Sequence, residues 1–173
     1  MIHVAKTVTV RRPRAEVFEF WRNIETLPVF MHHLKSVDDR GGGRSHWVAN
    51  GPAGTDVEWD AEIVAERDGE FISWRSVEGS DLKNEGTVRF KDAPADRGTE
   101  VSVDLQYDAP AGAVGAAIAK LFGEEPMLQL IDDLRRFKQV METGEVVLSD
   151  GSPEGAGQGV SAQQPAQPEA VRS

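Results

Sequence analysis

The chain has 173 residues, no cysteine, a hydrophobic share of 39% and a formal net charge of −10. This composition predicts one soluble globular domain, and the missing cysteines exclude disulfides and fit a reducing compartment, so we expect a cytoplasmic protein. The acidic charge argues against a nucleic-acid partner and leaves room for no more than a transient peripheral contact with a membrane. We find no signal peptide, and no apolar run reaches the roughly 18 residues of a membrane span.

The first 31 residues predict a strand followed by two short helices. Apolar residues alternate from Ile2 to Val10, as in a strand with one buried face. Residues 13–31 then show helical spacing, with Pro13 suited to a first helical turn. Pro28 divides this region, so we expect a helix, a turn and a second short helix.

Residues 34–108 change to a period of two, which predicts a run of antiparallel strands with one wet face. Glycines at 41–43 mark one hairpin and Asp68–Gly69 marks another turn. The inward-facing set along this run is Val57, Trp59, Ala61, Ile63, Gly86, Val88, Phe90, Thr99, Val101, Val103, Leu105 and Tyr107.

The next segment begins with small residues and ends as a long amphipathic helix. Gly112, Gly115, Ala116 and Ala119 either leave room for a ligand or allow close packing on the sheet. The helix that follows should turn one set of residues to the sheet (Met127, Leu130, Ile131, Leu134, Phe137, Met141) and another to water (Asp132, Asp133, Arg135, Arg136, Lys138).

The C-terminal stretch is rich in Gly, Pro, Ser and Gln and has no aromatic residue. Such a segment buries too little apolar surface to offset its chain entropy. We therefore expect a folded domain over residues 1–146 and a disordered tail over 147–173.

Four stretches resemble the bacterial polyketide cyclase/dehydrase and lipid-transport family of the START-like (SRPBCC) superfamily, which includes coenzyme-Q-binding proteins. They are "RPRAEVFEFWRNIETLPVFMHHLKSV", "ISWRSVEGSDLKNEGTVRF", "GTEVSVDLQYDAPAGAVGAAIAKLFGEEP" and "DLRRFKQVMETGE". The resemblance implies an α+β helix-grip fold. In that fold a curved antiparallel sheet of about six to seven strands wraps a long C-terminal helix, two short helices follow the first strand, and an apolar cavity lies between sheet and helix.

Strand aromatics are the strongest candidates for a ligand site. A concave sheet face could gather Trp47, Trp59, Trp74 and Tyr107 around a flat, partly oxygenated molecule, although plain core packing is the alternative. The residues expected to line the cavity are Trp47, Trp59, Trp74, Asn84, Val88, Phe90, Val103, Tyr107, Gly115, Ala119 and Phe122.

The residues give little support for a metal site, a cofactor site or a buried acid–base pair. We expect no metal and no cofactor, and a plain hairpin tip at "RGGGR". We expect His32 and His33 to be a solvated pair, with a place for either near the cavity entrance as the alternative, since the second short helix forms one cavity wall in the helix-grip fold. The carboxylates of "EWDAE" at 58–62 should face water opposite Trp59. Arg75 should also face water, and would become a buried cation only if the strand register were reversed.

Three functional hypotheses follow. The first is non-catalytic binding or transport of a hydrophobic small molecule such as an isoprenoid quinone, a lipid or a polyketide-like compound. The second is a polyketide cyclase or dehydratase that uses Tyr107, Asn84 or an inward Arg75, although no catalytic residues can be assigned. The third is an interaction module with Pro28, Phe30 and Met31 as an exposed patch. The oligomeric state is not predicted.

Overall fold

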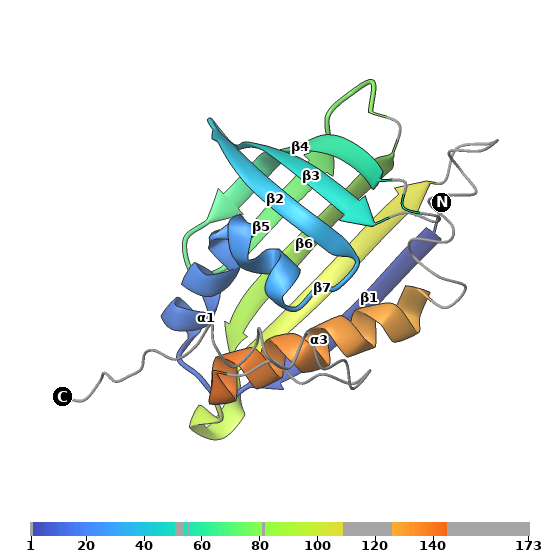
Figure 1. Cartoon of the computed structure of the whole chain (residues 1–173). Helices are drawn as coiled ribbons and strands as arrows, with labels where there is room; N and C mark the ends of the chain where they lie inside the picture. Colours follow the sequence, from blue (N-terminus) through green and yellow to red (C-terminus); the bar gives the residue numbers. More distant parts are fainter. Residues whose placement is uncertain (1, 51–53, 55, 81, 109–125, 145–173) are drawn as a thin grey trace.

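Seven strands form one antiparallel sheet in the order β1-β7-β6-β5-β4-β3-β2, so β1 and β2 are its two edges (Figure 1). The structure is a computed structural model that describes residues 2–50, 54, 56–80, 82–108 and 126–144. The elements are β1 (Ile2–Val10), α1 (Arg14–Arg22), the 3-10 helix η1 (Ile24–Val29), β2 (Leu34–Gly41), β3 (Arg44–Asn50), β4 (Asp56–Arg67), β5 (Phe71–Ser76), β6 (Lys83–Asp92), the 3-10 turn η3 (Pro94–Asp96), β7 (Thr99–Asp108) and α3 (Pro126–Thr143).

The strand pattern confirms the predicted inner face. On β4, Val57, Trp59 and Ala61 are buried while the acids between them are not. The predicted hairpin at 41–43 joins β2 to β3, and all three of its glycines have positive φ angles. Gly69 likewise turns the chain between β4 and β5. The sheet therefore has one apolar face that other elements must cover.

The long helix α3 covers part of that face. It runs along β1, on the side of the sheet from which β2 and β3 curl forward (Figure 1). Leu130, Leu134 and Phe137 are buried as predicted. Three predictions for this helix were wrong, because Asp133 is only 4% exposed, the Arg136 side chain is only 12% exposed and Met127 is 37% exposed.

A cluster of aromatic rings closes one end of the space between helix and sheet. The Phe137 ring on α3 lies 4.9 Å from that of Phe30 and 5.2 Å from that of Trp21. Phe90 on β6 meets Phe18 edge to face at 5.3 Å. Edge-to-face and tilted contacts of this kind are favourable beyond the area that they bury. The ring cluster (Phe18, Phe20, Trp21, Phe30, Phe90 and Phe137) is the packed half of the core.

The predicted exposed patch at Pro28, Phe30 and Met31 was wrong. Phe30 is fully buried and Met31 is 8% exposed. The 3-10 helix η1, with Pro28 inside it, ends beside them, and the backbone N–H groups of both residues donate to the carbonyl of Leu27. This tight turn directs both side chains into the core.

Three predicted cavity residues, Gly115, Ala119 and Phe122, lie outside the described residues, as do Gly112 and Ala116.

Within the described chain, no helix is long and apolar enough to cross a membrane. The helix α3 starts at Pro126 and ends at Thr143, before Gly144 with a φ of 78°.

Candidate functional site

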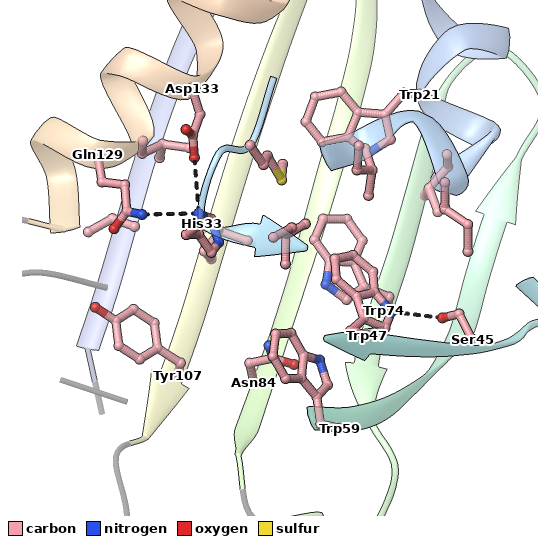
Figure 2. Close-up of a pocket in the computed structure, with 18 of the residues that line it drawn as sticks. Trp21, His33, Ser45, Trp47, Trp59, Trp74, Asn84, Tyr107, Gln129 and Asp133 are labelled. Atoms are coloured by element: carbon pink, nitrogen blue, oxygen red, sulfur yellow. Dashed lines mark hydrogen bonds and ion pairs between the residues drawn. The ribbon is translucent and has the colours of Figure 1, made fainter. Parts of the chain in front are cut away.

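An apolar cavity of about 90 Å³ lies between the inner face of the sheet, η1 and the first turns of α3. All four tryptophans of the chain line it (Figure 2). The remaining apolar walls are Val4, Ile24, Leu27, Met31, Leu34, Ile63, Ile72, Leu105, Pro126 and Leu130. Its polar lining consists of His33, Ser45, Glu62, Asn84, Tyr107, Gln129 and Asp133. Because most of its walls are apolar, the cavity suits a mainly hydrophobic occupant.

Two stacked indoles form one wall. Trp47 on β3 and Trp59 on β4 are directly paired across the strands, with ring centroids 5.8 Å apart and an interplanar angle of 21°. The Trp47 Nε1–H donates to the Ser45 hydroxyl at 2.9 Å, which satisfies its only buried donor. The bond fixes the ring, so this wall presents a flat, preorganised surface.

A third indole lies over a glycine. Trp74 on β5 pairs with Gly86 on β6, and a Cβ added at Gly86 would come within 2.6 Å of Trp74 Cζ2 and 2.8 Å of Leu105 Cδ2. Any side chain at this position would overlap the Trp74 ring. Gly86 therefore lets the ring lie close to the sheet and keeps it out of the middle of the cavity.

Four side chains form a polar cluster where α3 meets the loop before β2. His33 Nδ1 lies 3.0 Å from Gln129 Nε2, which donates to it, and 3.9 Å from Asp133 Oδ2 (Figure 2). Arg136 donates to Asp133 Oδ1 at 2.6 Å and to the carbonyl of Phe30 at 2.9 Å. With Nδ1 accepting from Gln129, a neutral His33 carries its proton on Nε2.

Burial shifts both titratable groups of this cluster toward their neutral forms. Desolvation, with a smaller effect of the Arg136 charge, lowers the pKa of His33 to about 4. Desolvation also raises the pKa of Asp133 to about 7, although the Arg136 guanidinium opposes this shift. At neutral pH the cavity therefore contains a neutral imidazole and a carboxyl group that exchanges its proton readily.

Asn84 and Tyr107 add two further polar groups and face each other across β6 and β7. The Asn84 Oδ1 atom is buried and, among the buried side-chain atoms of the described chain, is the one that lacks a hydrogen-bond partner. Leaving such an acceptor unpaired costs about 1–3 kcal/mol. Burial raises the pKa of Tyr107, so its phenol keeps its proton at neutral pH.

The structure divides the predicted cavity residues into two groups. Trp47, Trp59, Trp74, Asn84 and Tyr107 come together around the cavity, whereas Val88, Phe90 and Val103 lie buried away from its walls. Their binding roles remain predictions.

Predicted outward residues are placed as follows. Arg75 faces water with its side chain 60% exposed and pairs with Glu62 at 3.1 Å, so the reversed register does not occur. Glu58 and Asp60 lie on the wet face, where they bracket His46 and raise its pKa by hydrogen bonding. Glu62 was also predicted to face water, but its side chain is only 27% exposed and lines the cavity.

Sequence reasoning missed the polar cluster. His33 was predicted to be solvated, yet its side chain is 15% exposed, and Asp133 and Arg136 were assigned to the wet face of α3. The i, i+3 pair of Asp133 and Arg136 was the available signal. In the described ranges, no group of three or more His, Asp or Glu side chains could hold a metal ion.

The comparisons with known proteins agree with this architecture. The model of the family "Polyketide cyclase / dehydrase and lipid transport" matches residues 10–135, so the chain belongs to that family. A crystal structure of a Deinococcus radiodurans protein is 39% identical, with a TM-score of 0.68, and the match covers 83% of this chain and 99% of that one. The predicted helix-grip fold is confirmed by this likeness.

Two further proteins are similar at lower identity. An uncharacterised 17.2 kDa protein of Streptomyces lincolnensis is 29% identical over 142 residues, which are 82% of this chain and 91% of the relative. The Zhui aromatase/cyclase of a Streptomyces species is 15% identical with a TM-score of 0.60, covering 84% of this chain and 99% of that one. At that identity the likeness concerns the fold.

The opposite pKa shifts in the polar cluster predict opposite pH dependences for two variants. Asp133 holds its proton more tightly when folded, so its contribution to the free energy of unfolding falls as pH rises from about 4 to about 7 and is constant above. His33 binds a proton more weakly when folded, so its contribution falls as pH drops from 6.5 to about 4. Urea unfolding of the wild type, Asp133→Asn and His33→Gln at pH values from about 4 to about 7 measures both contributions.

The free energy of unfolding of the wild type minus that of Asp133→Asn should fall with rising pH. The free energy of unfolding of the wild type minus that of His33→Gln should rise with rising pH. Curves that stay parallel over this range would show that neither group is perturbed by the fold.

Proposed function

We propose that the protein binds a flat, mainly apolar small molecule in this cavity. The observation that carries the proposal is the placement of all four tryptophans around one mostly apolar void. Indole faces supply large apolar area and ring stacking for a planar guest. The family description, which names cyclases, dehydrases and lipid transport, supports a hydrophobic occupant of this kind.

The volume of the cavity limits the size of the ligand that it can hold. Sites for drug-sized ligands enclose roughly 300–1,000 Å³, and an engineered cavity of about 150 Å³ binds benzene. A volume of about 90 Å³ therefore accommodates one ring at most unless the walls shift. The ring of a quinone or one ring of a polyketide-like compound fits this description better than a long isoprenoid or acyl chain.

Two leucines on α3 give a matched test of the binding proposal. Leu130 lines the cavity, whereas Leu134, one turn later, is buried outside its walls. Leu130→Phe should fill the void, weaken p-cresol binding at least about tenfold, and leave stability within about 1 kcal/mol of wild type. Leu134→Phe should overpack the core, cost about 1–3 kcal/mol, and retain binding.

Calorimetric titration with p-cresol and urea unfolding of the three proteins provide the data. Wild-type affinity in Leu130→Phe, or equal destabilisation by both substitutions, would contradict a binding cavity at this place.

A second candidate function is proton-transfer catalysis, in the form of a dehydration in the same cavity. It is favoured by Asp133, a cavity-lining carboxyl group whose pKa is raised to about 7 by burial. Such a group can remove the α-proton of a β-hydroxy ketone and return a proton to the departing hydroxyl oxygen, which yields an enone and water. His33 and Arg136 would position the carboxyl group from either side.

The neighbouring aspartates on α3 provide the test of catalysis. With the aldol of benzaldehyde and acetone as substrate, the wild type should form benzylideneacetone faster than buffer does. Asp133→Asn should lower the rate at least about 100-fold. The exposed control Asp132→Asn should keep it. An undiminished rate in Asp133→Asn, or no acceleration by the wild type, would eliminate this candidate and leave binding alone.

A further inference from the structure

We propose that Asn84 is the hydrogen-bonding anchor of the cavity and that the ring it receives carries a hydroxyl group that donates to Oδ1. The inference rests on the binding function proposed above and adds the chemical class of the ligand, a phenol or an enol. It makes Asn84 a specificity-determining residue.

The first argument is the unused acceptor. Asn84 Oδ1 is buried and has no hydrogen-bond partner in the described chain. A buried amide oxygen without a partner is rare in folded proteins and calls for an explanation. A ligand in the cavity that donates a hydrogen bond to Oδ1 would be the missing partner.

The second argument is that the fold holds Asn84 without using its side-chain oxygen. Its backbone N–H donates to the Ser76 hydroxyl at 3.1 Å, and its backbone pairs with that of Tyr107 on β7. The residue therefore lies near the start of β6, a strand between β5 and β7, and its backbone is held by the Ser76 side chain on one side and by β7 on the other. Groups fixed in this way make more precise contacts than groups on loops.

The third argument is the apolar setting. Figure 2 places the Asn84 amide away from the polar cluster around His33, and the indoles of Trp59 and Trp74 line the same cavity as this amide. Two residues further along β6, Gly86 leaves the space into which Trp74 folds. A planar ring next to these indoles would bring a hydroxyl substituent to Asn84, whereas a ketone or a hydrocarbon would leave the oxygen unpaired.

A pair of ligands of the same shape tests the anchor. p-Cresol and p-xylene differ by a hydroxyl in place of a methyl group. Their dissociation constants are measured by NMR titration, following the four indole N–H signals, for the wild type, Asn84→Leu and Gln106→Leu. Gln106 lies on the other face of the same sheet, so its substitution is a matched control.

The quantity of interest is the preference for p-cresol over p-xylene in each protein. Comparing this preference between proteins cancels the different hydrophobicity of the two ligands. One neutral hydrogen bond corresponds to about three- to tenfold in affinity. We expect Asn84→Leu to lose a factor of this size in preference while it binds p-xylene at least as tightly as the wild type, and Gln106→Leu to keep the wild-type preference.

The outcomes separate the two proposals. If both ligands bind and Asn84→Leu keeps the wild-type preference, the anchor is wrong and the binding function stands. If neither ligand binds the wild type, the binding function fails and the anchor fails with it. Because Leu removes an unpaired polar atom, Asn84→Leu should also be at least as stable as the wild type, and a large loss of stability would show a structural role instead.

Discussion

The apolar inner face of the sheet is the constraint on which this molecule depends. Among the described residues, seven strands present their inner side chains to the long helix α3 and the two short helices α1 and η1. The ring cluster around Phe137 fills one half of the space. Beyond the ring cluster, the side chains of the sheet and the helices do not fill the space between them, and the cavity lies there. Protein interiors otherwise pack at the density of organic crystals, so a void of this size stands out.

The polar cluster links that cavity to the packed half of the core. Arg136 bonds both the Asp133 carboxyl group and the carbonyl of Phe30, a member of the ring cluster. Burying a carboxyl group is unfavourable, and the guanidinium offsets part of that cost while fixing α3 against the end of η1. The same contact holds Asp133 and Gln129 next to His33. Arg136 thus contributes both to the packing of α3 and to the chemistry of the cavity.

The sequence predicted which face of each strand is buried, because a period of two reports alternation directly. It did not predict where along a strand a residue lies relative to the cavity. Val88 and Phe90 share an inner face with Asn84, yet Phe90 packs against Phe18 and Trp21 in the ring cluster. Asp133 was assigned to water because isolated acids favour water, and only the folded position of Arg136 reverses that expectation. The contact of Arg136 with the carbonyl of Phe30, 106 positions away in the chain, leaves no local pattern.

If a ring binds between the indoles and the polar cluster, the most direct test is to locate one there. Intermolecular nuclear Overhauser effects from bound p-cresol to the assigned side chains of the protein give that position. We predict contacts from the ring to the indole protons of Trp47, Trp59 and Trp74 and to the methyl groups of Leu130. Contacts confined to exposed apolar residues such as Val64 and Leu128, with none to the indoles, would contradict the account.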